Sequence, residues 1–447
     1  MQKKGKGTEA IYNVRQLGVG KTLVLGLQHT FAMFGATVLV PLLTGLSVPT
    51  TLLCAGIGTL LFHLLTKGKV PAFLGSSFAF LGGFGIVAPM LADESGQFTV
   101  PNLERLPYAC GGVVAAGLVY LLMSGLIAVF GVRRIMRFFP PVVTGPIIIA
   151  IGLILAPTAI QNCSSNWLLA FVALGVVVAC NIWGRGMVKI LPILIGIIVS
   201  YIVALCMGAV EFDAIRQAAW FGVPLSTSAM AKFDLSSILT IMPIALATMM
   251  EHIGDIAAIS ATTGKNYIRD PGLHRTLLGD GLATSLAGFL GGPANTTYGE
   301  NTGVLALTKI YDPLVMRIAA CFAILLSFCP KFGAAINTVP TAIVGGISFI
   351  LYGMISAIGV RNVVENRVDF TNSRNLIIAA VILVSALGFN SAYPNGLPLY
   401  EGAGFSISLS GLAIAAILGI VLNAALPGND YEFDGTEKGD QALNMKV

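Results

Sequence analysis

Two short stretches, Pro71-Ala-Phe-Leu-Gly-Ser-Ser77 and Pro293-Ala-Asn-Thr-Thr-Tyr-Gly299, interrupt long apolar segments of this chain. Runs of proline, glycine, β-branched and hydroxyl-bearing residues disfavour a helix and favour extended backbone. Extended backbone at membrane depth is tolerated only where it lines a cavity or is buried in protein. We therefore predict two half-strands that meet near the bilayer centre, each leading into a short helix. The N-termini of these helices and the free amides would face a polar ligand.

The two stretches belong to an internal repeat. Pro71-Ala72 recurs as Pro293-Ala294, 222 residues later, and Gln28-His29 recurs as Glu251-His252, 223 residues later. This shared offset is about half of the 447-residue chain and corresponds to seven apolar spans. Because a repeat with an odd number of spans enters the membrane from the opposite side in its second copy, the sequence predicts two inverted repeats.

The composition is that of a protein whose solvent is the bilayer. Hydrophobic residues make up 55% of the chain and charged residues only 11%, and apolar stretches of about 20 residues recur, each long enough to span a membrane. We predict an all-α polytopic membrane protein with 14 transmembrane segments in two inverted seven-span repeats, in which the half-strands start spans 3 and 10. The spans cover residues 22–43, 49–66, 70–92, 109–132, 142–157, 167–183, 190–210, 239–262, 277–292, 293–310, 318–329, 340–360, 376–389 and 405–426.

Positive charge is distributed unevenly between the predicted loops. With both termini in the cytoplasm, the positive residues left outside are Arg105, Arg216, Lys232 and Lys331. Positive residues are retained on the cytoplasmic side of short loops, so we expect a multi-pass inner-membrane protein with both termini cytoplasmic. The net charge of +5 then follows from topology and gives no reason to expect nucleic acid as a partner.

Cysteine usage indicates no metal site and no disulfide framework. Most of the seven cysteines lie inside apolar spans, and none forms a C-x-x-C pair. We therefore expect no metal and no cofactor other than a co-transported proton.

Four carboxylates fall inside predicted spans, where an ionisable group costs roughly 3 kcal/mol on insertion scales. Glu251 and Asp255 lie four residues apart, hence on one helix face, where repulsion favours protonation of one of them. The alternative is that they bond to hydroxyl or backbone groups of neighbouring helices. Glu300 follows the second broken stretch and either contacts a ligand or caps a helix. Asp280 either takes part in proton coupling or is an interfacial acid.

Histidines and aromatic residues near these positions have ordinary interpretations as well as functional ones. For His29 and His252, the sequence favours a single hydrogen bond between packed helices over a titrating role. Phe73, Tyr298 and Tyr352 are placed to sandwich a flat ligand, although an aromatic residue in a membrane protein lies by default in the core or at the interface.

Several segments resemble one family of transporters. They are Gln28-His29, KVPAFLGSSFAF at 69–80, EHIGD at 251–255, RDPGLHR at 269–275 and NTTYGENTGVLALTK at 295–309. The last segment contains a signature pattern. It begins with an acid or amide followed by Asn, any residue and Gly, and after four further residues it ends with Thr and a basic residue. Here these are Glu300-Asn301-Thr302-Gly303 and Thr308-Lys309. Over most of its length the chain is similar to the nucleobase:cation symporters of the nucleobase–ascorbate transporter family.

This resemblance implies a domain plan and a mode of action. Spans 1–4 and 8–11 would form a core domain and spans 5–7 and 12–14 a gate domain, in a homodimer that works by an elevator-like movement. Residues 22–132 and 239–333 would then be core, and residues 133–210 and 334–426 gate. Residues 1–21 would form a cytoplasmic N-terminus, 211–238 an external loop and 427–447 a cytoplasmic tail.

The resemblance also implies where the substrate lies. It would sit between the half-strands, contacted by the side chains of Glu251 and Glu300 and by backbone near Phe73 and Gly299. Ala36 and Tyr352 would lie close by, and we add Tyr298 from its position in the broken stretch. Proton coupling would fall to Glu251, Asp255 and Asp280.

The substrate class follows from single positions within this resemblance. A glutamate at Glu300 resembles the uracil branch, because purine-transporting relatives usually carry an amide there. Asp255 and Asp280 instead resemble the xanthine and urate branch, since the familiar uracil permeases have a histidine and an amide at these places. We expect proton-coupled uptake of uracil. Ionised Glu251 and Glu300 would accept hydrogen bonds from its ring N–H groups.

Two other transport activities are alternatives to uracil uptake. One is a xanthine or purine:proton symporter on the same fold. The other, less favoured, is an anion carrier of related fold, against which the acids at the site argue because anion binding favours basic residues or bare helix N-termini. An enzyme finds no support in the sequence, which contains no metal-ligand cluster, nucleophile elbow or phosphate loop.

Overall fold

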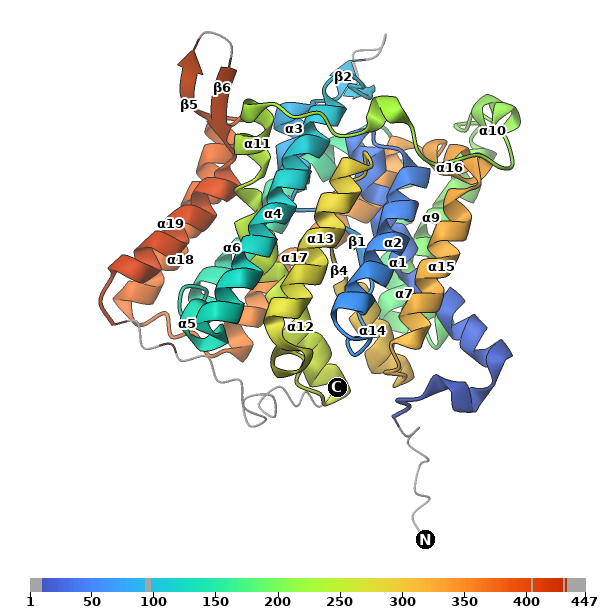
Figure 1. The fold of residues 1–447 in the computed structure, drawn as a ribbon. Coiled ribbons are helices and arrows are strands. Elements are labelled where there is room, and N and C mark those ends of the chain that lie inside the picture. Colours follow the sequence, from blue (N-terminus) through green and yellow to red (C-terminus); the bar gives the residue numbers. More distant parts are fainter. Residues whose placement is uncertain (1–9, 93–97, 403–404, 429–430, 432–447) are drawn as a thin grey trace.

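The computed structural model describes residues 10–92, 98–402, 405–428 and 431, and gives the backbone alone for residues 98, 99, 300, 401, 402, 405 and 406. The described chain is mostly helical, and its long helices run side by side between two opposite ends of the bundle (Figure 1). Within this described part, seven helical segments are long and apolar enough to cross a membrane. They are α1 (Val19–Thr44), α2 (Val48–Leu65), α4 (Leu106–Phe130), α6 (Pro141–Ser164), α11 with α12 (Leu235–Ile241 and Ile244–Thr263), α17 (Thr341–Glu365) and α18 (Ser373–Ala392).

Shorter helices complete the bundle. Helix α15 (Leu314–Ser327) turns by 87° into α16 (Pro330–Asn337), and the pair counts as an eighth candidate span if it is one segment. The apolar helices α7 (Trp167–Trp183), α9 (Pro192–Cys206) and α19 (Gly411–Ala425) fall below the length of the others, and α13 (Leu273–Phe289) packs among the long ones. The remaining short pieces are η1 (Val14–Leu17), α5 (Val132–Met136), α8 (Met187–Ile190), α10 (Asp213–Gln217), η2 (Thr227–Ala229) and η3 (Ile268–Gly272).

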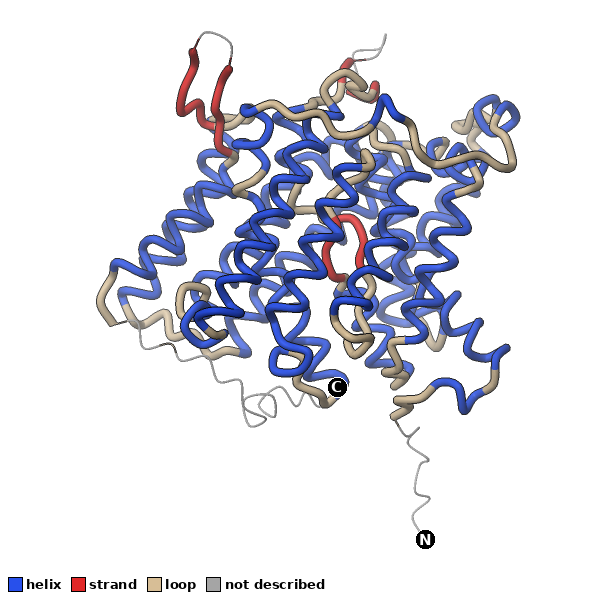
Figure 2. Tube along the Cα trace, viewed as in Figure 1, coloured by secondary structure: helices blue, strands red, loops and turns tan. Residues whose placement is uncertain are grey.

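The two broken stretches each contain a short strand, as predicted. Strand β1 (Leu74–Ser76) pairs antiparallel with β4 (Asn295–Thr297), with Gly75 opposite Thr296. Figure 2 shows this strand pair in the middle of the helical bundle. Strand β1 leads into the short helix α3 (Leu81–Val87), and β4 leads into α14 (Gly299–Thr308). The prediction that these stretches are extended, meet each other and feed short helices is therefore confirmed.

Helix contacts divide the bundle into two groups. In the first group, α13 packs on α4 and α2, and α15 packs on α1 and α2. In the second, α17 packs on α6 and α7, and α18 packs on α6 and α19. Glycines allow the closest approaches: a Cβ on Gly117 of α4 would lie 2.5 Å from the carbonyl oxygen of Gly281, and one on Gly152 of α6 would lie 2.1 Å from that of Tyr352. Such small residues let helix backbones approach closely within a membrane.

Two further hairpins lie outside the predicted pattern. Strands β2 (Leu91–Ala92) and β3 (Phe98–Val100) pair, as do β5 (Leu397–Gly402) and β6 (Phe405–Leu409). The predicted last span, 405–426, is therefore wrong at its start, because residues 405–409 form a strand and the helix begins at Gly411. The sequence Phe-Ser-Ile-Ser-Leu at this point alternates apolar and polar residues, a period typical of a strand.

Candidate functional site

Side chains from the surrounding helices hold the paired strands in place. The hydroxyl of Thr59 on α2 accepts a hydrogen bond from the amide of Leu74 over 2.9 Å and donates to the carbonyl of Leu74 over 3.3 Å. The amide group of Asn295 donates to the carbonyl of Cys54 on α2 over 3.0 Å, and Thr284 on α13 donates to the carbonyl of Asn295 over 2.7 Å. Both strands are thus fixed from outside their own ladder, because buried backbone groups require partners.

Tyr298, predicted to contact substrate, is fixed between β1 and α1. Its ring lies against Gly75, where an added Cβ would come within 2.4 Å of the ring carbon Cζ. Its hydroxyl donates to the carbonyl of Ser76 over 3.1 Å and accepts from Thr37 over 3.3 Å. The amide of Tyr298 donates to the carbonyl of Phe73 over 3.0 Å. These contacts give Tyr298 a role in joining the strand pair to α1.

The other predicted apolar contacts lie around the same strands. Phe73 precedes β1 and is fully buried, and Ala36 is fully buried on α1 beside Thr37. Tyr352 on α17 packs edge-on against Phe78, with ring centroids 6.0 Å apart. Because Phe78 lies between β1 and α3, this contact brings an aromatic ring of the second helix group against the segment that leaves the strand pair.

Two of the predicted acids lie on α12, one turn apart. Asp255 accepts a hydrogen bond from the hydroxyl of Thr297 at the end of β4, over 2.9 Å. Its Oδ1 also lies 3.6 Å from the position that a Cβ on Gly299 would occupy, at the start of α14. Glu251 is partly buried on the same helix. Glu300 is the second residue of α14, but its side chain lies outside the described part of the structure.

Asp280 lies behind the strand pair rather than at an interface. It is fully buried on α13, and its Oδ2 lies 3.0 Å from Nδ1 of His252 on α12, which is also fully buried. The hydroxyl of Thr297 lies 3.5 Å from the same nitrogen. The contact agrees with the interpretation of His252 as a histidine bonded between packed helices, although the sequence did not identify Asp280 as the partner.

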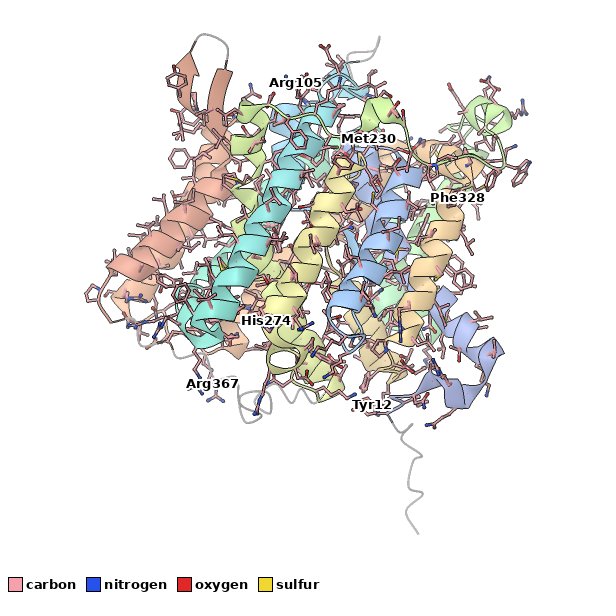
Figure 3. All side chains as sticks on the ribbon, in the orientation of Figure 1. Tyr12, Arg105, Met230, His274, Phe328 and Arg367 are labelled. Atoms are coloured by element: carbon pink, nitrogen blue, oxygen red, sulfur yellow. The ribbon has the colours of Figure 1, made fainter. Side chains whose placement is uncertain are left out.

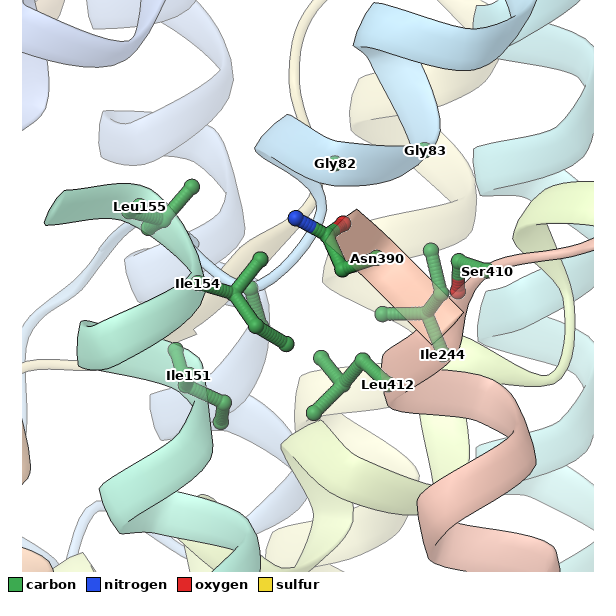
Figure 4. A pocket seen from close by; sticks show the side chains of 10 residues that line it. Gly82, Gly83, Ile151, Ile154, Leu155, Ile244, Asn390, Ser410 and Leu412 are labelled. Atoms are coloured by element: carbon green, nitrogen blue, oxygen red, sulfur yellow. The ribbon is translucent and has the colours of Figure 1, made fainter. Parts of the chain in front are cut away.

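A separate small pocket lies between α3, α6, α12 and α19 (Figure 4). Apolar side chains of α6, α12 and α19 line it together with Asn390 at the end of α18 and Ser410 before α19. None of the predicted site residues whose side chains the structure describes lines this pocket. Ile244 at its edge is seven residues before Glu251 on α12, hence on the same helix face two turns away.

The sequence is similar to a set of bacterial permeases. The model of a permease family matches residues 20–394. A probable uracil permease of Pasteurella multocida is 42% identical over 416 residues, which cover 91% of this chain and 94% of the relative. The uracil permease of Bacillus subtilis is 42% identical over 418 residues, covering 90% and 91%. That of Bacillus caldolyticus is 41% identical over 423 residues, covering 92% and 93%.

The fold is similar to that of solved transporters with little sequence identity. The transmembrane domain of a cyanobacterial bicarbonate transporter, BicA, aligns with a TM-score of 0.64 at 16% identity, covering 91% of this chain and 99% of that one. A murine solute carrier 26 anion transporter, Slc26a9, aligns with a TM-score of 0.63 at 11% identity, covering 94% and 73%. At such identities the likeness concerns the fold alone.

The permease family and the long apolar helices both indicate a multi-pass membrane protein. The relatives are named as permeases, so the chain is a permease rather than an enzyme. The family model covers most of the chain, and the sequence relatives are about 42% identical over nine-tenths of it. The chain therefore belongs to the permease family, within the nucleobase:cation symporter-2 transporters.

Proposed function

We propose that this permease carries uracil across the inner membrane together with a proton, by an elevator-type alternating-access mechanism. The observation that carries the proposal is the pairing of β1 with β4 inside the bundle, with Asp255 beside the start of α14. Such a pairing puts backbone amides and a helix N-terminus in protein-enclosed space, where a polar ligand can replace water. The names of the relatives, uracil permeases from several bacteria, support the choice of ligand.

Uracil suits this arrangement by its chemistry. It is a neutral, planar ring with alternating N–H donors and carbonyl acceptors along one edge. Ionised Glu251 and Glu300 would accept hydrogen bonds from the ring N–H groups, and backbone amides near Phe73 and Gly299 would serve the carbonyls. Charge-assisted hydrogen bonds of this kind are stronger than neutral ones, and loss of either carboxylate would leave a ring N–H without its acceptor.

The proposed topology has 14 spans in two inverted repeats with both termini cytoplasmic. Support comes from the order of elements: two helices, a strand and a short helix occur as α1, α2, β1 and α3 and again as α12, α13, β4 and α14. Positive charge gives independent support. Figure 3 places Arg367 at the end of the bundle that carries Tyr12, and Arg105 at the opposite end. Arg105 is one of the positive residues that the proposed topology leaves outside.

We also propose a core of residues 22–132 and 239–333 and a gate of residues 133–210 and 334–426, a division that the two groups of helix contacts support. The paired strands would belong to the core, and the aromatic ring of Tyr352 in the gate would pack on Phe78, just after β1. An elevator movement would carry the strand pair and its ligand past the gate helices. We further propose that the gate supplies the contact surface of a homodimer.

A xanthine or purine symporter is the second candidate, favoured by one specific observation. Asp255 and Asp280 are both carboxylates, and both lie in one set of polar contacts next to the strands. An anion carrier is less well supported despite the similar fold of BicA and Slc26a9, because carboxylates at the site would repel an anionic ligand.

Glutamine variants of the two glutamates test the proposed binding chemistry. Glu251→Gln and Glu300→Gln keep the size of the side chain but remove the negative charge that strengthens its hydrogen bonds with the ring N–H groups. We expect both purified variants to lose uracil binding by at least about tenfold, the loss of one charge-assisted hydrogen bond. Glu365→Gln is the matched control, because Glu365 pairs with Arg361 at the end of α17 away from the strands. Full uptake and binding by both site variants would contradict the assignment.

A further inference from the structure

Four polar side chains from three elements form a continuous line behind the paired strands. Asp255 on α12 accepts from the hydroxyl of Thr297 on β4 over 2.9 Å. That hydroxyl lies 3.5 Å from Nδ1 of His252, also on α12. The same nitrogen lies 3.0 Å from Oδ2 of Asp280 on α13. Each neighbour in the line is thus within or at the limit of hydrogen-bond distance.

The line runs from the edge of the candidate site into the protein interior. Asp255 is partly buried and faces the start of α14 at Gly299, whereas Thr297, His252 and Asp280 are at most 1% exposed. A fully buried carboxylate needs a partner or a proton, since an isolated buried charge costs several kcal/mol. Among the ion pairs of the described residues, the partner of Asp280 is His252. The charge state of Asp280 therefore depends on where a proton lies along this line.

The elements packed around the line add few titratable groups. From α2, the ring of Phe62 lies 6.4 Å from the ring of His252. From α4, the hydroxyl of Tyr120 donates to Thr248 over 2.6 Å and so is turned to α12. On α12 itself, Glu251 directly precedes His252. Among the described residues these neighbours supply one phenol and one further carboxylate, and the line itself contains the imidazole of His252, a ring that can accept and donate a proton.

We propose that Thr297 and His252 relay the coupling proton between Asp255 at the site and Asp280 in the interior. Protonated Asp255 donates its proton to the Oγ1 of Thr297, and the hydroxyl proton of Thr297 passes to Nδ1 of His252. Nδ1 then gives a proton to Oδ2 of Asp280. One proton has moved, Asp255 is left ionised, Asp280 is protonated, and Thr297 and His252 are unchanged.

The relay rests on the proton-coupled uptake proposed above and adds two residues to it. Asp255 lies on α12 and Asp280 on α13, and the contacts of Thr297 and His252 connect them. Thr297 is the intermediary that belongs to the strand pair itself, one residue before Tyr298. Its 3.5 Å separation from His252 is the longest link of the line, so a small shift of β4 against α12 is enough to interrupt the route.

The test measures proton exchange and ligand binding separately on the full-length protein. Purified Thr297→Val and His252→Gln are mixed with uracil in weakly buffered detergent solution, and the proton uptake per bound uracil is read from a pH indicator. Thr297→Val keeps shape and removes the hydroxyl; Thr297→Ser restores it. Thr276→Val is the matched control, because Thr276 is buried on α13 and its hydroxyl donates to Leu273 of its own helix. The same proteins are then reconstituted in liposomes, where we measure uracil exchange across the membrane and uracil accumulation driven by a pH gradient.

A relay predicts that Thr297→Val and His252→Gln bind uracil and exchange it nearly as the parent does. Their proton uptake and their gradient-driven accumulation should fall by about tenfold or more. Thr297→Ser and Thr276→Val should behave like the parent.

If the parent couples to protons and both relay variants keep its proton uptake, the relay is wrong while the proposed function stands. If the parent binds uracil without exchanging a proton, the proposed coupling and the relay both fail. A variant that loses uracil binding together with proton uptake also contradicts a pure relay role.

Discussion

The ring of Tyr298 lies directly on Gly75, the central residue of β1, which pairs with the strand β4 that ends just before Tyr298. A Cβ at residue 75 would approach the ring at 2.4 Å, a separation that real atoms do not adopt. The glycine is therefore required by the close approach of a side chain, and the tyrosine holds α1 to the strands through its hydroxyl. Tyr298 contributes to the shape of the site even where it does not touch the ligand.

Replacing this glycine tests the importance of that contact. Gly75→Ala should displace the Tyr298 ring and reduce uracil uptake. It should also lower the free energy of unfolding by about 1–3 kcal/mol, as overpacking does. The measurement is a melting curve together with uptake in cells. Gly85→Ala in α3 is the control, because no atom lies within 4 Å of a Cβ built there. Equal behaviour of the two variants would show that the ring moves aside at no cost.

The attachment of β1 to α2 through Thr59 gives a second prediction. Thr59→Val keeps the shape of the side chain but leaves the buried amide of Leu74 without its partner, which should cost about 1–3 kcal/mol. Thr51→Val on the same helix is the matched variant, since the hydroxyl of Thr51 bonds to Ser47 of its own helix turn. Chemical or thermal unfolding of both proteins would measure the difference, and equal stability would argue against the anchoring role.

The segment before α1 is bound to residues 310–312, just before α15. Ile11 pairs with Ile310, and the amide of Val14 donates to Oδ2 of Asp312 over 2.8 Å. The other oxygen of Asp312 accepts from the amide of Leu314 at the start of α15. Asp312→Ala removes both bonds and should cost about 1 kcal/mol, as loss of a helix cap does. Limited proteolysis near residue 12 should become faster, whereas Asp213→Ala in the exposed α10 should leave it unchanged.

A surface ion pair provides a pH test. The hydrogen bond and charge of the Lys69 ammonium, 2.7 Å from Oδ1 of Asp270, hold the pKa of that carboxyl below its usual value. The pair therefore stabilises the fold above the ordinary carboxyl pKa of about 3.9, and this contribution is lost as the pH falls through the lowered value. Because the side chains are 43% and 65% exposed, the effect should be small and screened by salt.

Melting temperatures of the parent and of Asp270→Asn measure this contribution. The variant should melt slightly below the parent at pH 6, and the gap should close as the pH is lowered past 4 or as salt is added. A gap that stays constant across this pH range would contradict the ion-pair explanation.

The centre of the fold is predictable from the sequence because its deviations from a helix are local. Proline and glycine at Pro71, Gly75 and Pro293 disfavour helix regardless of tertiary context, so the two half-strands could be placed from composition and spacing. The 222-residue offset then indicated that the stretches are equivalent and meet.

Other features depend on contacts that the sequence does not contain. The polar line through His252 and Thr297 requires the packing of α12, α13 and β4, and no single-sequence pattern specifies which face of α13 presents Asp280. Strand β6 falls inside the predicted span 405–426 because its residues are apolar enough in a window, although their alternation is typical of a strand.

The proposal depends most directly on ligand identity, and a thermal-shift panel of nucleobases on the purified protein at several pH values measures it. We expect uracil to stabilise the protein selectively, by an amount that changes with pH. Ligand binding to the folded state raises the melting temperature, and the rise is larger for a tighter ligand. A larger shift with xanthine than with uracil would contradict the uracil assignment and favour the purine alternative. No shift with any nucleobase would contradict the proposed substrate class altogether.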